Sequence, residues 1–206
     1  MNPGIADVLL AAGASRRFEG KKLLAVCGGE TLIARAASLT QDAAVGTRLA
    51  VFGEIEFALI EAAADAAMGF VVNRHWQRGQ GTSVAAGVSA IGRNCGAVLI
   101  RLADQVLVTQ DDIDALLETA RATPHAIVAA HYDGILGVPA VFPRRCFEAL
   151  LSLDGDRGAR RIIADDDRVV TVDLPNAAVD IDLREDLARA ESALISRARE
   201  RHSARS

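Results

Sequence analysis

The stretch that decides the fold is residues 8–22, VLLAAGASRRFEGKK, which changes from apolar to small to cationic along its length. Residues 5–11 are apolar apart from Asp7, a pattern typical of a strand buried on both faces. Small residues continue to position 15, and the cations that follow are Arg16, Arg17, Lys21 and Lys22. A strand that opens into small residues exposes backbone N–H groups, which bind anions well beside Arg and Lys. The stretch therefore predicts a strand and a triphosphate-binding loop, with an ordinary strand-to-helix turn and solvated cations as the alternative.

Length and composition narrow the class of protein. The 206 residues are 50% hydrophobic and 24% charged, which predicts one globular domain over 1–196 and a polar C-terminal tail over 197–206. A formal charge of −4 argues against a general nucleic-acid binder, and no apolar run approaches the roughly 18 residues of a membrane span. The N-terminus shows no signal-peptide pattern, and the widely spaced Cys27, Cys95 and Cys146 predict reduced, buried thiols. We therefore expect a cytoplasmic protein.

Apolar strands and amphipathic helices alternate along most of the chain. Strands are predicted at 5–11, 48–52, 70–72, 97–102, 126–130 and 169–172. Helices are predicted at 31–39, 55–67, 84–91, 145–151, 158–164 and 183–199, with another after a Thr109–Asp112 capping box. Residues 73–83 are expected to form a glycine-rich loop, and residues 131–142 a hairpin or lid at one end of the sheet. The alternation predicts an α/β fold with a mainly parallel sheet covered on both faces.

A second candidate site follows the predicted strand at 97–102, where Asp104 comes just past the carboxyl end. Ligands of open α/β sheets bind at that edge. A carboxylate there suits Mg²⁺, a hard cation that prefers oxygen ligands and often bridges to substrate phosphates. The alternative for Asp104 is a turn residue or a helix cap.

A third candidate is the segment Asp180-Ile181-Asp182, which is expected to lie at a strand end. Strand alternation would put both carboxylates on one side and Ile181 on the other. Two adjacent carboxylates repel each other unless a cation or solvent lies between them. The segment therefore predicts either a metal site or a solvated strand end.

A fourth candidate, residues 73–84, combines one tryptophan with glycines and hydroxyl side chains. A glycine such as Gly81 permits close approach of a base or ribose. The alternative is structural, because Thr82 or Ser83 would also serve as the N-cap of the following helix. Trp76 is either a ligand contact or a core or hinge residue.

The opening stretch resembles the signature of the nucleotidyltransferase family that includes the molybdenum cofactor cytidylyl- and guanylyltransferases, L-A-[AG]-G-x-S-x-R-[MF]-G-x-x-K. The residues that match it in register are Leu10, Ala11, Ala12, Gly13, Ser15, Arg17, Phe18 and Lys22. Glu19 departs from the signature, with Gly20 one place later. Asp104 and Gln105 match the family's [LM]-x-D-Q-P motif, although Val106 replaces the proline.

Further segments resemble the family in the same order along the chain. Asp180, Ile181 and Asp182 match its D-I-[DN]-T-P-x-D-L motif, with Leu183 and Arg184 in place of Thr-Pro. Residues 73–83 match the segment that closes over the nucleotide, and residues 134–142 and 155–160 match segments near the acceptor. A structural turn with a helix cap is the alternative for the last two segments.

The resemblance implies a three-layer α/β/α Rossmann-like nucleotide-diphospho-sugar transferase fold. The implied reaction transfers a nucleotidyl group from an NTP to a phosphorylated acceptor and releases pyrophosphate. The implied catalytic residues are Arg17, Lys22 and Asp104, and the implied Mg²⁺ ligands are Asp104 and Asp182. The implied nucleotide-binding residues are Leu10, Ala11, Ala12, Gly13, Ser15, Arg17, Lys22, Gly81, Ser83 and Asp104. The implied acceptor-binding residues are Gly137, Pro139 and Arg160.

Within the family, Ala11-Ala12-Gly13 resembles the pyrimidine branch, which implies CTP as donor and molybdopterin-bound molybdenum cofactor as acceptor. The expected partners are these small molecules and a molybdenum hydroxylase or its chaperone, with no nucleic acid and no membrane. Two alternatives stay open. One is a related nucleotidyltransferase that uses GTP or a different phosphorylated acceptor, and the other is a non-enzymatic chaperone that binds the molybdenum cofactor.

Overall fold

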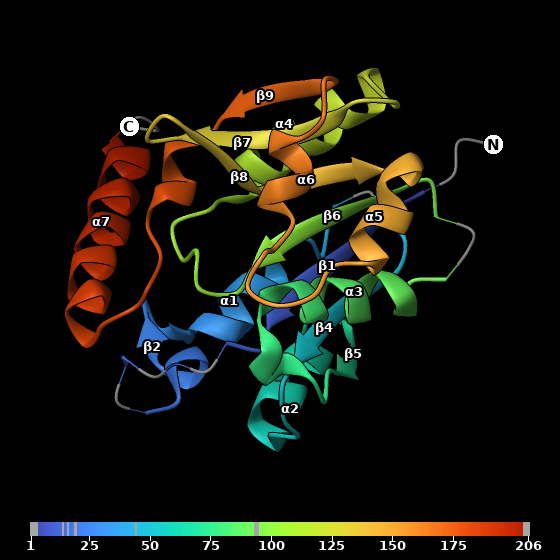
Figure 1. The fold of residues 1–206 in the computed structure, drawn as a ribbon. Helices are drawn as coiled ribbons and strands as arrows, with labels where there is room; N and C mark the ends of the chain where they lie inside the picture. Colours follow the sequence, from blue (N-terminus) through green and yellow to red (C-terminus); the bar gives the residue numbers. More distant parts are fainter. Residues whose placement is uncertain are drawn as a thin grey trace.

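A seven-stranded sheet forms the centre of the molecule, in the order β5-β4-β1-β6-β8-β7-β9 (Figure 1). The computed structural model describes residues 4–203 apart from positions 14, 16, 19, 44, 93 and 94. The strands are β1 (Ile5–Ala11), β4 (Arg48–Phe52), β5 (Gly69–Val72), β6 (Ala97–Leu102), β7 (Ile127–Tyr132), β8 (Ile135–Pro143) and β9 (Val169–Asp173). Every pairing is parallel except those of β8, which runs antiparallel to β6 and β7. The prediction of a mainly parallel sheet is therefore confirmed.

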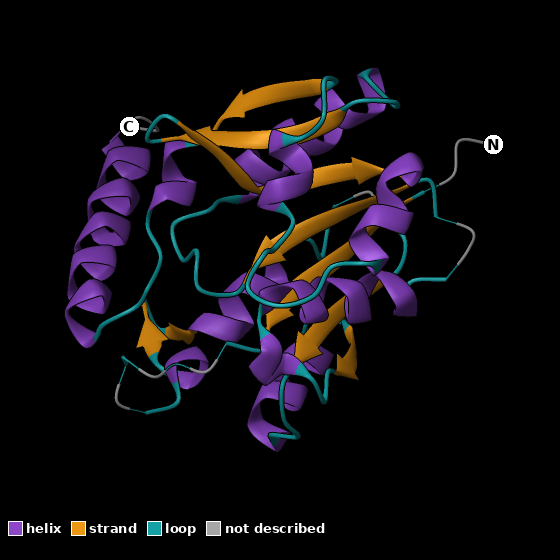
Figure 2. Ribbon diagram, viewed as in Figure 1, coloured by secondary structure: helices purple, strands orange, loops and turns teal. Residues whose placement is uncertain are grey.

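Helices cover both faces of the sheet and complete three layers (Figures 1 and 2). One face carries α3 (Gln80–Ala90), α5 (Phe147–Leu151) and α6 (Arg160–Ala164). The other carries α1 (Leu32–Ser38), α2 (Phe57–Asp65), α4 (Gln110–Ala122) and α7 (Arg184–Ser203). The shorter elements are β2 (Val26–Cys27), β3 (Glu30–Thr31) and the 3₁₀ turns η1 (Lys22–Leu24), η2 (Trp76–Arg78), η3 (Arg144–Cys146) and η4 (Pro175–Ala178). The predicted three-layer α/β/α fold is confirmed.

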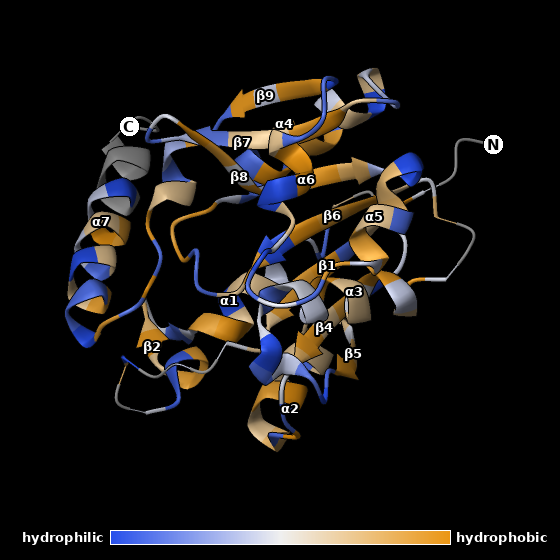
Figure 3. Ribbon diagram, in the orientation of Figure 1, coloured by the Kyte–Doolittle hydropathy of each residue, from blue (hydrophilic) through white to orange (hydrophobic). Residues whose placement is uncertain are grey.

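Strand β1 shows why the opening stretch decides this architecture. Successive side chains of a strand point to opposite faces. Val8 and Leu10 pack in the core beneath α3, whereas Leu9 and Ala11 pack in the core on the side of α1 and α2. A strand buried on both faces needs a continuous apolar run, and Figure 3 shows the hydrophobic colours following the central strands.

The predicted hairpin at 131–142 is confirmed, but it is part of the sheet. Asp133 and Gly134 form its turn with φ angles of 49° and 74°, and an Asp-Gly pair tolerates two positive φ angles. The hairpin turns β8 back between β6 and β7, so it contributes a central strand. The long-range pairing of β8 with β6 has no local sequence signal.

Three further boundaries differ from the prediction. Helix α3 begins at Gln80, so Gly81, Thr82 and Ser83 lie inside the helix and Gly79 is its N-cap. The predicted strand end at 180–182 is wrong, because this segment is an irregular connection between η4 and α7. Helix α7 continues to Ser203, within the predicted polar tail.

Two local predictions are confirmed, the capping box of α4 and the buried cysteines. Helix α4 has the predicted capping box, in which Thr109 Oγ1 accepts from Asp112 N and the Asp112 carboxylate accepts from Thr109 N. Cys27, Cys95 and Cys146 are buried and unpaired, as expected. None of the helices in the described part of the chain combines the length and apolar character that crossing a membrane requires.

Three charged residues and one threonine lie between the sheet and helices α1 and α2, and we call Asp7, Thr40, Arg48 and Arg101 the buried charge cluster. Arg101 donates to both Asp7 carboxylate oxygens at 2.8 Å, and to the carbonyl of Ala36 at the end of α1. Thr40 donates to Asp7, and Arg48 donates to Thr40 and to backbone carbonyls of α1 and the end of α2. Asp7 is fully buried and Arg101 is 2% exposed. The cluster therefore ties α1 and α2 to β1, β4 and β6 through hydrogen-bonded charges.

Candidate active site

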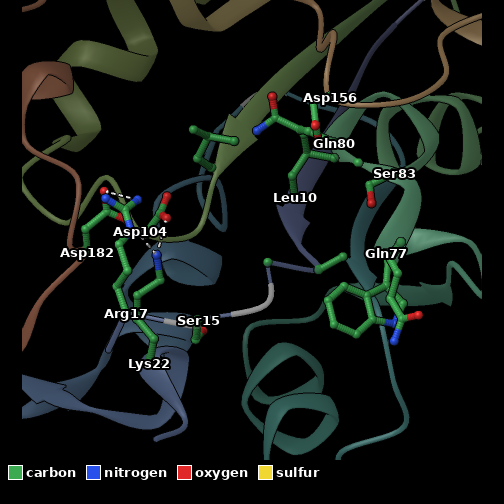
Figure 4. Close-up of a pocket in the computed structure, with 15 residues that line it drawn as sticks. Leu10, Ser15, Arg17, Lys22, Gln77, Gln80, Ser83, Asp104, Asp156 and Asp182 are labelled. Carbon is green, nitrogen blue, oxygen red and sulfur yellow. Dashed lines mark hydrogen bonds and ion pairs between the residues drawn. The ribbon is translucent and has the colours of Figure 1, made fainter. Parts of the chain in front are cut away.

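A cavity of about 500 Å³ opens where β1 and β6 end, at the carboxyl edge of the sheet (Figure 4). Leu10, Ala12, Gly13 and Ser15 approach it from the end of β1, and Asp104 from the end of β6. The other residues that line it are Arg17, Lys22, Trp76, Gln77, Gly79, Gln80, Ser83, Leu102, Asp156 and Asp182. Most of the predicted nucleotide site is thus gathered around one cavity at the edge where α/β sheets bind ligands.

Charged side chains gather on one wall of this cavity, and we call Arg17, Lys22, Asp104 and Asp182 the cavity charge cluster. Lys22 Nζ lies 2.6 Å from Asp104 Oδ2 and 3.8 Å from Asp182 Oδ1, and Arg17 Nη2 lies 2.8 Å from Asp182 Oδ2. The Lys22 side chain is only 8% exposed, whereas that of Arg17 is 70% exposed. Lys22 is therefore a fixed cation between two carboxylates, and Arg17 is a surface cation at the entrance.

The loop after β1 presents open backbone to the cavity. A Cβ placed on Gly13 would have no heavy atom of the described residues beyond its chain neighbours within 4 Å, so the space beside its Cα is open there. Ser15 has a positive φ of 48° and its carbonyl accepts from Phe18 N at 3.0 Å, which turns the chain back toward the core. Ala14, Arg16 and Glu19 lie outside the described residues, so the departure at Glu19 stays untested. Ala11 lines a neighbouring cavity of about 300 Å³ on the other side of the loop.

The opposite wall carries uncharged polar groups and one carboxylate (Figure 4). Ser83 Oγ accepts from Asn73 Nδ2 at 3.0 Å, while Gln80 and Asp156 line the cavity beside Leu10. Gly81 does not line it. A Cβ on Gly81 would lie 2.9 Å from Arg157 O and 3.0 Å from Gly155 O, so this glycine serves the packing of the 154–157 loop on α3.

A second cavity of about 280 Å³ adjoins the first and shares Leu10, Gln80, Leu102 and Asp156 with it. Arg160, which is predicted to bind the acceptor, lines it together with Tyr132 and Asp180. Its apolar floor comes from Leu10, Val84, Ile100, Leu102 and Val138. Gly137 and Pro139 do not line it; the intervening Val138 does. A Cβ on Gly137 would lie 2.6 Å from the Tyr132 hydroxyl, so Gly137 makes room for that side chain.

Comparison with known proteins identifies the family. The sequence model of the MobA-like NTP transferase domain matches residues 8–172. The chain belongs to this family. It is 30% identical to the purine catabolism protein PucB of Bacillus subtilis over 174 residues, 79% of this chain and 82% of PucB. It is 31% identical to the nicotine blue oxidoreductase of Paenarthrobacter nicotinovorans over 167 residues, 77% of this chain and 80% of that protein.

Solved structures agree on the fold. A nucleotidyl transferase from Methanothermobacter has a TM-score of 0.76 at 21% identity, covering 94% of this chain and 98% of that one. The manganese complex of Rv0371c from Mycobacterium tuberculosis has a TM-score of 0.74 at 22% identity, covering 92% and 98%. The fold is therefore that of nucleotidyltransferases, and a divalent metal is bound in a protein of the same fold.

Residues of this MobA-like domain that depart from the family motifs make defined contacts in the structure. Arg184, one of the two residues that replace Thr-Pro, places its guanidinium 5.4 Å from the centroid of the Phe18 ring. Val106, which replaces the proline, is 4% exposed, and its carbonyl accepts from Arg35 Nε at 2.8 Å.

Asp186 accepts from the backbone N–H groups of Asp182 and Leu183, and the Leu183 bond is the main reason that the pKa of Asp186 lies below its usual range.

The carboxylates fit a divalent cation. No group of three or more His, Cys, Asp or Glu side chains is arranged as a metal site in the part of the chain that the structure describes. Asp104 and Asp182 instead both face the ammonium of Lys22, and Asp180 lies close enough to feel their charge. Desolvation first, and then the charges of Asp104 and Asp182, raise the pKa of Asp180 to about 6. A negatively charged pair of carboxylates suits a hard cation that takes its remaining oxygen ligands from substrate phosphates.

Several residues of these cavities have no signal in the sequence. Gln77 and Gln80 line the first cavity, Tyr132 lines the second, and Asp156 lines both. Asp156 lies in the segment that resembles the acceptor side of the family, and nothing in its spacing predicts that it also lines the first cavity.

Proposed function

We propose that this protein transfers CMP from CTP to the phosphate of molybdopterin-bound molybdenum cofactor, with release of pyrophosphate. The observation that carries a nucleotidyl transfer is the cavity charge cluster. Two cations and two carboxylates line one cavity beside a loop whose backbone is open. Binding of the cofactor alone would need an anion site but no paired carboxylates.

The triphosphate would lie along the loop after β1. The backbone N–H groups of Gly13 and Ser15 would bind the β- and γ-phosphates, which leave as pyrophosphate, and Arg17 would donate charge-assisted hydrogen bonds to them. The Arg17–Asp182 ion pair joins side chains that are 70% and 43% exposed. Such a pair contributes about 0–1 kcal/mol, so a phosphate displaces Asp182 from Arg17 at little cost.

Lys22 would stabilise the reacting phosphate. Its ammonium is held by Asp104 at 2.6 Å in a position that is 8% exposed, so its charge is weakly screened. Fixed charges of this kind stabilise the negative charge that spreads over phosphoryl oxygens in the transition state. An attacking phosphate is already ionised at neutral pH, and the reaction therefore needs alignment and cations more than a general base.

Asp104 and Asp182 would hold Mg²⁺, as the clustering of their charges supports. When bound there, the metal supplies Lewis-acid stabilisation of the phosphoryl oxygens. Lys22 keeps the two carboxylates compensated when no metal is present, because an isolated pair would repel. The manganese bound in a protein of the same fold supports a divalent cation without specifying which one.

The second cavity would receive the acceptor. It joins the first at Leu10, Gln80, Leu102 and Asp156, so a molecule in it lies next to the nucleotide. Arg160 would bind its phosphate, and the aliphatic floor would contact its apolar surface.

The choice of CTP rests on the resemblance of Ala11-Ala12-Gly13 to the pyrimidine branch, since the names of the two relatives give neither a nucleotide nor an acceptor. A cytoplasmic location belongs to the same proposal.

The test is pyrophosphate release by the full chain with molybdenum-loaded molybdopterin, Mg²⁺ and CTP, GTP, ATP or UTP in turn. Release with CTP alone supports the proposal. Release with GTP would show that the protein transfers a guanylyl group. Release that occurs only with a sugar phosphate in place of molybdopterin would show that the acceptor is a sugar phosphate.

The remaining alternative is a chaperone that binds the cofactor without transferring a nucleotide. It predicts no pyrophosphate with any nucleotide and tight binding of molybdopterin by the folded protein. Asp104→Asn separates the two functions, because it would abolish nucleotidyl transfer and leave the cofactor binding of a chaperone intact. The matched control is Asp114→Asn on α4, which lines neither cavity.

A further inference from the structure

Gln105, the residue after Asp104, joins three separate parts of the chain. It is 5% exposed, and its side-chain Nε2 donates to Val138 O at 3.0 Å and to Ala177 O at 2.9 Å. Val138 belongs to the floor of the second cavity. Ala177 lies in η4, which leads directly into the segment that carries Asp180 and Asp182.

The chemistry of these contacts requires an amide. An NH₂ group has two protons and can donate to two carbonyls at once, whereas a hydroxyl has one and a carboxylate has none. If the amide were turned over, its oxygen would face two carbonyl oxygens. Gln105 Oε1 has no hydrogen-bond partner among the described residues although it is buried, and an unsatisfied buried acceptor is costly.

The position of Gln105 links these bonds to the carboxylates. The backbone carbonyl of the adjacent Asp104 accepts from Ile181 N at 3.1 Å, and Ile181 stands between Asp180 and Asp182. The Asp104 turn is thus fastened to the Asp182 segment twice, directly by its own carbonyl and through η4 by Gln105.

We infer that Gln105 is a positioning residue that sets the spacing of Asp104 and Asp182 and couples it to Val138 in the second cavity. This inference rests on the proposed function, in which the two carboxylates hold a divalent cation. Gln105 reaches neither the cation nor the nucleotide, because it lines neither cavity. Its effect is on the geometry of the ligands, as expected for residues that orient metal-binding side chains.

The experiment measures binding of Mn²⁺ to the full chain, with and without CTP, from the loss of the free-ion electron paramagnetic resonance signal. Gln105→Leu keeps the approximate size of the side chain and removes both donors. The expected result is a dissociation constant for Mn²⁺ raised about 10- to 100-fold. CTP binding without metal should stay within about twofold, because Gln105 does not contact the nucleotide cavity. Saturating Mn²⁺ should restore part of the transfer rate.

Gln110→Leu is the matched control. It removes a half-buried amide that donates to Asp114 on α4 and lines neither cavity, so it should leave Mn²⁺ binding unchanged. If Gln105→Leu fails to fold, Gln105→Met offers a more adaptable side chain that also lacks the donors.

Equal Mn²⁺ affinity in wild type and the folded Gln105 variant would overturn the inference and leave the proposed function standing. Equal loss in the Gln110 control would also overturn it, since the effect would then be general. Wild-type protein that binds CTP but no Mn²⁺ would overturn the proposed metal site, and the inference with it. The two failures are therefore distinguishable.

Discussion

Among the described residues, the buried charge cluster and the cavity charge cluster both combine Asp with Arg or Lys, and β1 and β6 carry or precede members of each. The buried charge cluster lies between the sheet and helices α1 and α2, where Asp7 is fully buried and Arg101 is 2% exposed. The cavity charge cluster lies beyond the carboxyl ends of the same strands, where Arg17 is 70% and Asp182 43% exposed. In the first, each carboxylate oxygen of Asp7 has a donor from Arg101, with a further bond from Thr40.

The two clusters differ in how many hydrogen-bond partners hold each charged side chain in place. Arg101 also donates to the carbonyl of Ala36, and Arg48 donates to the carbonyls of Ala37 and Ala66, so these charges hold helices on the sheet. In the cavity, Asp182 is shared between a loosely held Arg17 and a Lys22 at 3.8 Å. Committed charges support the fold, and exchangeable charges beside an open cavity can bind a ligand.

The largest expected effect is on the buried charge cluster. Asp7→Ala leaves Arg101 as an unpaired cation in the core, which costs about 3–5 kcal/mol of unfolding free energy. Asp182→Ala should cost no more than about 1 kcal/mol, because its pair with Arg17 is exposed and Lys22 keeps Asp104 as a partner at 2.6 Å. Urea unfolding at neutral pH measures both. A loss below about 1 kcal/mol for Asp7→Ala would contradict the comparison.

The double replacement Asp7→Leu with Arg101→Met tests whether the loss comes from the unpaired charge. Replacing both members of a buried pair by apolar side chains is often neutral. The double variant should therefore be more stable than Asp7→Leu alone. If it is less stable, the hydrogen bonds to α1 and not the uncompensated charge carry the effect.

The next effect is on the cavity charge cluster. Lys22→Met keeps the buried stem of the side chain and removes the charge beside Asp104, so the rate of pyrophosphate release should fall about 10²- to 10³-fold. Lys21→Met is the control, because Lys21 pairs with Glu56 outside the cavity charge cluster and is 66% exposed. Its rate should stay within about twofold of wild type. Similar losses in the two variants would mean that overall positive charge, and not position, matters.

Arg17 should separate binding from stability. Arg17→Gln removes charge-assisted hydrogen bonds of about 1.5–3 kcal/mol to the triphosphate, which predicts a nucleotide dissociation constant raised about 10- to 100-fold. The unfolding free energy should change by less than about 0.5 kcal/mol. Arg168→Gln removes another exposed Arg–Asp pair and should change neither quantity. A clear loss of stability in Arg17→Gln would mean that its charge is committed to the fold.

The sequence predicted the cavity charge cluster better than the buried one. Asp104 follows an apolar run and Arg17 follows a small-residue loop, so both could be placed at the carboxyl ends of strands, where parallel strands bring residues together. The segment of Asp182 was placed at a strand end and proved to be irregular. Asp7 and Arg101 are 94 residues apart, and their pairing depends on the register between β1 and β6, which no local pattern gives.

Other features missed by the sequence have the same physical origin. The insertion of β8 between β6 and β7 is a long-range pairing. Gly81 was expected to approach the nucleotide, yet it is required by the 154–157 loop that packs on it. Gln105 was visible as a motif residue, but its two carbonyl partners come from distant segments. The local periodicity of a sequence predicts its helices and strands, but contacts between them depend on the register in which the strands pair, which the periodicity does not give.

The smallest effect tests a residue that combines the two kinds of behaviour. Asp186 is buried like Asp7, yet it accepts from the backbone of Asp182 in the cavity charge cluster. Asp186→Ala removes bonds to two N–H groups at the start of α7 and should cost about 1 kcal/mol of unfolding free energy at pH 7. Glu185→Ala, which removes a neighbouring acidic charge from the same turn, should cost less.

The pH dependence of this loss has a defined sign. The pKa of Asp186 is lowered in the folded state, first by its bond from the Leu183 N–H. A lowered pKa means that the carboxylate stabilises the fold fully above its unfolded pKa of about 3.9, and that this contribution disappears as the pH falls through the folded pKa. The difference between wild type and Asp186→Ala, measured by urea unfolding from pH 7 to pH 3, should therefore shrink only below about pH 4. A difference that is constant over this range would show that Asp186 acts by packing and not by its charge.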